Sequence, residues 1–85
     1  MLVPLKESEG KVLLALLVHD TPIMTLPKEA KLGSSAVYNS VRWLSERGLV
    51  AETREKEAPR RRMIGLTEKG QKIATMLQQI EETLS

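Results

Sequence analysis

The chain has 85 residues, no cysteine and a formal net charge of +2. This length allows one small domain, 1–85, with a marginal core, and the absence of cysteine excludes disulfides and cysteine-based zinc sites. One Trp, one Tyr and no Phe exclude an aromatic platform that stacks several single-stranded bases. The charge is uneven, because residues 60–72 hold five basic residues and one acidic residue, a density that suits nucleic acid.

The first predicted element is a helix over residues 6–19, after a non-helical start at Pro4. Ser8 is its candidate N-cap. The apolar run 12–18 is too short to span a bilayer, so we expect no membrane partner. Its Leu and Ala content favours a helix over the alternative, a buried strand. Because apolar side chains surround the axis, one side should face the core and another a partner subunit.

A short extended segment is predicted at 23–24, followed by a second helix over residues 25–32. Thr25 is the candidate N-cap of this helix, and Pro27 lies in its first turn. A third helix is predicted over residues 34–47, where Gly48 has the position of a helix-ending glycine.

The third helix is amphipathic. Val37, Val41 and Leu44 recur at i, i+4 and i+7 and predict a core stripe. The opposite side carries polar residues: Ser35, Tyr38, Asn39 and Arg42. Trp43 lies between the two sides and is interpreted as a packing residue.

A β-hairpin is predicted within residues 49–66, with strands at 49–53 and 61–66 and a charged, exposed turn between them. Three arginines, 60–62, lie beside the turn, and strand alternation prevents all three from facing one groove. The last helix is predicted over residues 67–84, capped by Thr67. It carries an apolar seam at spacings of 4, 3 and 4: Ile73, Leu77, Ile80 and Leu84.

This order of elements resembles the winged helix-turn-helix fold, a mainly α fold with a small β-hairpin as its wing. The pattern Tyr38-x-x-Val41-x-x-Leu44-x-x-x-Gly48-Leu49-Val50 is similar to the recognition helix of PadR regulators and its exit. Arg60 or Arg61 followed by Leu66-Thr67-Glu68-Lys69-Gly70 is similar to the second wing strand and the next helix. The resemblance is closest to the PadR and MarR families and to small winged-helix regulators of archaea and their viruses.

The resemblance implies a homodimeric transcriptional regulator that binds double-stranded DNA, and the lack of cysteine fits a cytoplasmic location. A helix fits the major groove, where Asn39 could pair with adenine and Arg42 with guanine or a phosphate. The residues expected at DNA are Ser34, Ser35, Tyr38, Asn39, Arg42, Arg60 and Arg61. The alternative is that these side chains form only a solvated face and a solvated hairpin.

Two surplus apolar faces predict that the first and last helices build a two-fold interface. Its expected residues are Leu13, Leu17, Ile73, Leu77, Ile80 and Leu84. With His19 as the only histidine, no metal site, catalytic triad, enzyme activity or cofactor is expected, and no effector is indicated. Two alternatives to a regulator remain: a protein-interaction module of a transcription or replication complex, and a non-specific chromatin-type binder.

Overall fold

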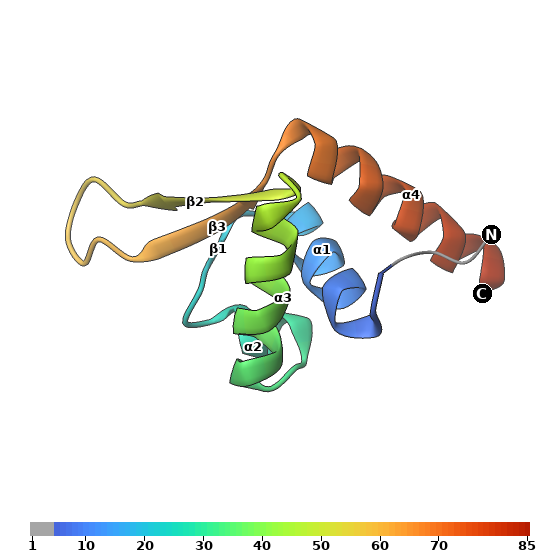
Figure 1. Ribbon diagram of the computed structural model, residues 1–85, viewed down its shortest axis with the longest axis horizontal. Helices are drawn as coiled ribbons and strands as arrows, with labels where there is room; N and C mark the ends of the chain where they lie inside the picture. Colours follow the sequence, from blue (N-terminus) through green and yellow to red (C-terminus); the bar gives the residue numbers. More distant parts are fainter. Residues whose placement is uncertain (1–4) are drawn as a thin grey trace.

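The computed structural model describes residues 5–85, so the predicted start at Pro4 lies outside the described residues. The elements follow in the order α1 (Glu7–Val18), β1 (Thr21–Pro22), α2 (Leu26–Ala30), α3 (Ser34–Glu46), β2 (Val50–Arg54), β3 (Arg62–Leu66) and α4 (Glu68–Leu84). Along the longest axis the β2–β3 hairpin extends in one direction and the end of α4 in the other (Figure 1). No helix within residues 5–85 is long and apolar enough to cross a membrane.

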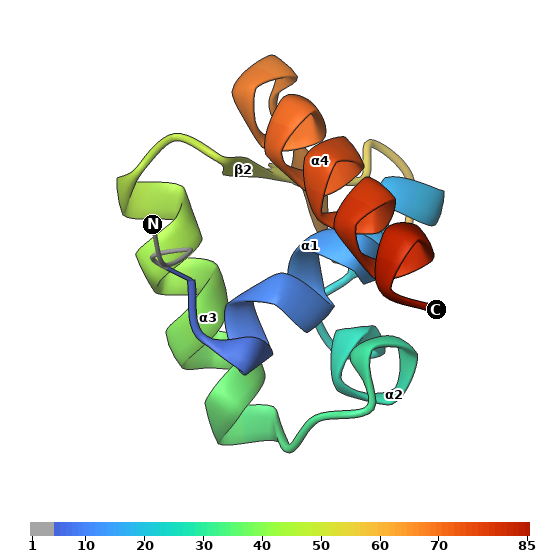
Figure 2. The same ribbon diagram turned by 90° about the vertical axis from the view of Figure 1, so that its right-hand side faces the viewer.

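Helix α1 lies at the centre of the domain, in contact with α2, α3, α4 and β3 (Figure 2). Its apolar side chains are therefore covered on several sides by the chain itself. Val18 nevertheless remains 78% exposed, and the expectation that one side of α1 faces a partner stays a prediction. Leu13 has no exposed surface, so it is a core residue and is unavailable to a second subunit.

The start of α1 differs by two residues from the predicted Ser8 cap. Lys6 holds the N-cap position with extended backbone. Its backbone N–H donates a hydrogen bond to Glu9 Oε1 at 2.9 Å. The carboxylate of Glu9 thus closes the first turn from inside the helix, where negative charge is also favoured by the helix dipole.

The sheet has three antiparallel strands in the order β1-β3-β2, one more than the predicted hairpin. The additional strand, β1, pairs Thr21 with Ile64 and Pro22 with Met63. The predicted extended segment at 23–24 therefore begins two residues too late. A proline is tolerated in β1 because this strand lies at the sheet edge.

The core stripe of α3 is confirmed, because Val37, Val41 and Leu44 are all buried. Gly48 has a φ of +72° beyond the end of α3, as the predicted helix-ending glycine requires. Thr67 is the N-cap of α4, as predicted, and its hydroxyl oxygen accepts from the Gly70 N–H at 3.0 Å.

Helices α2 and α3 with their connecting turn form a helix-turn-helix, and the β2–β3 hairpin forms the wing beside it (Figure 1). The chain therefore has the winged helix-turn-helix fold, as its sequence pattern predicts.

Candidate nucleic-acid interface

Helix α3 presents one row of polar side chains to solvent. Its members recur at i, i+3, i+4 and i+7 and are all exposed: Ser35, Tyr38, Asn39 and Arg42. They point outward because the apolar stripe of the same helix packs into the core. The helix thus offers two hydroxyls, one amide and one guanidinium on a single face, which is a set of groups that can read base edges and hold phosphate.

The start of α3 is open to solvent. Gly33 occupies the N-cap position with extended backbone, and no side chain caps the first turn. Ser34 and Ser35 are exposed there. The free backbone N–H groups and the positive end of the helix dipole favour an anion at this end of the helix.

The recognition helix and the wing meet at a shared hollow of about 210 Å³. Tyr38 and Arg42 enter from α3, and Glu52 and Arg62 enter from the wing. The remaining lining residues are mostly apolar: Ile23, Val41, Ser45, Val50 and Ile64. The exposed row of α3 and the inner face of the wing therefore lie on the same side of the molecule.

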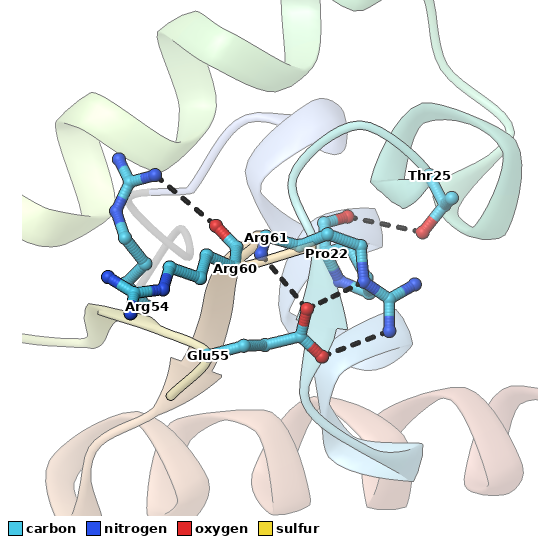
Figure 3. Close-up of polar contacts among 6 residues, drawn as sticks. All are labelled: Pro22, Thr25, Arg54, Glu55, Arg60 and Arg61. Atoms are coloured by element: carbon cyan, nitrogen blue, oxygen red, sulfur yellow. Dashed lines mark hydrogen bonds and ion pairs between the residues drawn. The ribbon is translucent and has the colours of Figure 1, made fainter. Parts of the chain in front are cut away.

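Two of the three adjacent arginines form ion pairs within the wing. Arg61 binds Glu55 through Nε at 2.8 Å and through a terminal nitrogen at 3.0 Å, and its backbone N–H donates to the same carboxylate at 2.9 Å (Figure 3). These hydrogen bonds, the side-chain bond first, lower the pKa of Glu55 to about 2. Arg62 binds Glu52 at 2.7 Å, and this hydrogen bond lowers the pKa of Glu52.

The hairpin register assigns these arginines to different faces. Arg54 lies opposite Arg62, and Glu52 lies opposite Ile64, so these four side chains share the face that borders α3. Glu55, one position further on, belongs to the other face, and Arg61 extends with it away from Arg54 (Figure 3). Arg61, a predicted DNA contact, is therefore already paired with a carboxylate of the same chain, and its side chain points away from the face that borders α3.

Two other arginines of the wing are differently placed. Arg60 is exposed and forms no ion pair within residues 5–85. Arg54 was not among the predicted contacts, yet it shares the inner face of the wing with Arg62. The signal that identifies Arg54 is strand parity, because it lies four residues after the buried Val50 and so points to the same face.

The predicted dimer residues separate into two groups. Leu17, Ile73 and Leu77 are half-buried against the chain's own core. Ile80 is 45% exposed and Leu84 is 82% exposed. Met76, absent from the prediction, is 51% exposed at the same spacing of four. An uncovered apolar stripe therefore remains on α4, defined by Met76, Ile80 and Leu84.

Trp43 is half-buried and packs against the core, in agreement with its interpretation as a packing residue. The guanidinium of Arg47 lies 3.7 Å from the centre of its ring, a cation–π contact. Within residues 5–85 no three potential metal-binding side chains lie together.

The comparisons with known proteins agree on the fold. No family model matches the chain, and no curated protein matches it significantly. Among solved structures, a mutant form of ZitR from Lactococcus lactis is similar with a TM-score of 0.89 and 22% identity, covering 98% of this chain and 57% of that one.

Two further structures are similar over nearly the whole chain. The adhesin competence repressor AdcR from Streptococcus pyogenes has a TM-score of 0.81 and 23% identity over 95% of this chain and 61% of that one. The MarR family transcriptional regulator SPO1453 from Silicibacter pomeroyi has a TM-score of 0.77 and 26% identity over 93% of this chain and 56% of that one. The chain thus spans a little over half the length of these structures. Its likeness to the PadR family and to archaeal regulators stays a prediction.

Proposed function

We propose that the chain is a sequence-specific, double-stranded DNA-binding domain of a transcriptional regulator that acts as a homodimer. One observation carries the proposal: the exposed polar row of α3 and the inner face of the wing border the same hollow. A duplex placed against this side would meet a helix that fits the major groove and a basic hairpin that can contact the neighbouring backbone. Solved structures of similar fold that are described as a repressor and as a transcriptional regulator support it.

In this arrangement α3 enters the major groove. Asn39 pairs with adenine through its amide, and Arg42 pairs with guanine or grips a phosphate. The Tyr38 hydroxyl and the open start of the helix hold the DNA backbone, which fixes the position of the helix without reading sequence. The wing lies against the neighbouring backbone or minor groove and supplies positive charge.

The second subunit binds through α4. The stripe of Met76, Ile80 and Leu84 faces solvent on the long helix, and burial of such side chains stabilises association by roughly 1.5–3 kcal/mol for each fully buried residue. A two-fold dimer would place two copies of α3 in successive major grooves, at half-sites about one helical turn apart.

The decisive experiment selects bound duplexes from a random pool and measures affinity for the selected sequence. Arg42→Ala and Asn39→Ala should each weaken that binding by about 1–3 kcal/mol, or roughly 5- to 150-fold, and relax selectivity at one base pair. Lys11→Ala is the matched control, because Lys11 is exposed on α1 and pairs with Glu7 at 3.3 Å.

The other outcomes identify the alternatives. Equal affinity for every duplex would identify a non-specific binder. Absence of duplex binding at low salt would refute the proposal and favour a protein-interaction module.

A further inference from the structure

Only part of the positive charge of the wing is free to bind a ligand, because carboxylates of the wing already pair with some of its arginines. Its turn region carries four arginines, Arg54 and residues 60–62, together with Lys56. Two of these arginines have a carboxylate partner at hydrogen-bonding distance. Arg61 lies 2.8 Å from Glu55, and Arg62 lies 2.7 Å from Glu52. Their charges are therefore largely compensated before any ligand arrives, which leaves Arg54 and Arg60 as the arginines of the turn without an ion pair in residues 5–85.

Arg61 is held by three separate hydrogen bonds to one carboxylate. Two come from its guanidinium in the bidentate arrangement that arginine and carboxylate prefer, and the third comes from its own backbone N–H. A phosphate could bind Arg61 only by competing with a carboxylate that is already aligned. Because the pKa of Glu55 is lowered to about 2, the carboxylate stays charged at any physiological pH.

Arg54 and Arg60 lie together on the opposite side of the hairpin. A terminal nitrogen of Arg54 donates to the carbonyl oxygen of Arg60 at 3.2 Å, which ties the two residues to one another (Figure 3). Figure 3 shows both guanidinium groups on the side away from Arg61. Most N–H donors of Arg54 remain unused, because a guanidinium has five.

The register turns Arg54 toward the recognition helix, and the hydrogen bond between Arg54 and the Arg60 carbonyl keeps Arg60 beside it. Arg54 shares a strand face with Glu52 and with Ile64, and both of these line the hollow beside Tyr38 and Arg42. Neither Arg54 nor Arg60 has a carboxylate at ion-pair distance within residues 5–85, although the charge of Arg54 helps Arg62 to lower the pKa of Glu52. Each guanidinium therefore keeps N–H donors free for an anion. Phosphate oxygens match the planar donor geometry of arginine.

We infer that Arg54 and Arg60 form the phosphate-binding pair of the wing, and that Glu55 is a positioning residue that retains Arg61 on the outer face. This inference rests on the proposed function. It assigns the wing contact to Arg54, which the sequence pattern did not indicate, and withdraws it from Arg61. The ligand is the backbone of duplex DNA, where adjacent phosphates can each take one guanidinium.

The test measures the salt dependence of affinity for a fixed duplex with the full chain and three charge-removing variants. Each phosphate contact contributes about −0.9 to the slope of log K against log salt concentration. Arg54→Gln and Arg60→Gln should each make the slope less steep by about 0.9. Arg61→Gln should leave the slope unchanged, and it is the matched control because it removes the same charge from a neighbouring position.

A second variant covers the case in which loss of Arg61 leaves the negative charge of Glu55 uncompensated beside the DNA. The double substitution Glu55→Gln with Arg61→Gln removes the ion pair without changing net charge, and its slope should equal that of the unsubstituted chain. A slope that becomes less steep by about 0.9 both with Arg61→Gln and with the double substitution, or that is unaffected by Arg54→Gln and Arg60→Gln, would overturn the assignment while leaving DNA binding intact. No duplex binding by the unsubstituted chain would overturn both the assignment and the proposed function.

Discussion

Gly70 makes the closest backbone approach of any glycine in the described chain, and its replacement by alanine gives a quantitative test of how α4 is seated. A Cβ added at Gly70 would overlap the carbonyl oxygen of Leu49 and lie 2.8 Å from its carbonyl carbon. That carbonyl oxygen also accepts from the Thr67 N–H at 3.1 Å. The start of α4 is therefore held against the turn after α3 by a backbone hydrogen bond, to which the Thr67 hydroxyl adds a bond to the Gly48 carbonyl oxygen at 2.6 Å.

The expected effect is the difference between two opposing terms. Alanine gains about 1 kcal/mol over glycine in helix propensity. Overpacking costs about 1–3 kcal/mol of stability, and the atoms of Leu49 that the new Cβ would meet belong to the backbone, which cannot rotate away as a side chain can. Loss of the Thr67 hydrogen bond adds about 1 kcal/mol. We expect Gly70→Ala to destabilise the domain by about 1–3 kcal/mol, which lowers Tm by roughly 5–20 °C in a chain of this size.

Gly10 in α1 supplies the matched control, because a Cβ built there has nothing within 4 Å. Gly10→Ala should stabilise the domain by about 0.5–1 kcal/mol through helix propensity alone. Thermal and urea denaturation followed by circular dichroism measures both variants. If Gly70→Ala raises Tm as Gly10→Ala does, the close approach of α4 to the turn is wrong.

Three further predictions concern the cap, the wing and the dimer. Thr67→Ala should cost about 0.5–2 kcal/mol of unfolding free energy in urea titrations, because it removes the N-cap of α4; an unchanged midpoint would contradict the cap. The pKa of Glu55 is lowered to about 2 by its pairing with Arg61. This pairing therefore stabilises the fold fully at pH values above the pKa of the carboxyl in the unfolded chain, and the contribution is lost as the pH falls through about 2. The stability difference between the unsubstituted chain and Glu55→Gln should therefore be small, because the pair is solvent-exposed, and should shrink from about pH 4.5 downward; a difference that grows in acid would contradict the ion pair. Ile80→Glu should convert the dimer to monomer in size-exclusion chromatography with light scattering, whereas Met24→Glu, at an exposed site outside α4, should not; a monomeric unsubstituted chain at high concentration would refute the dimer.

The sequence by itself determined the elements whose signals are local. The third and last helices could be predicted because each has a clear apolar period and a recognisable end, Gly48 after one and Thr67 before the other. The hairpin followed from two short apolar runs around a charged turn that contains Pro59. The exposed row of α3 was predictable for the same reason, since burial of one helix face fixes the orientation of the opposite face.

The tertiary structure alone decided which surfaces remain free. The apolar run of α1 predicted a partner, but α4 and α3 cover most of it and leave Val18 exposed, because one helix can be buried on several sides by elements distant in sequence. The third strand, β1, could not be foreseen, because a two-residue strand has no period and exists only by pairing with β3.

The roles of the arginines in the wing also depended on pairing across the hairpin. In sequence Arg60 and Arg61 are equivalent neighbours, and Arg54 lies outside the arginine triplet. The register of β2 on β3 orients Glu55 toward Arg61 and leaves Arg54 beside Arg60, so the face that a charge occupies and the carboxylate that it meets are set by strand pairing and not by order along the chain.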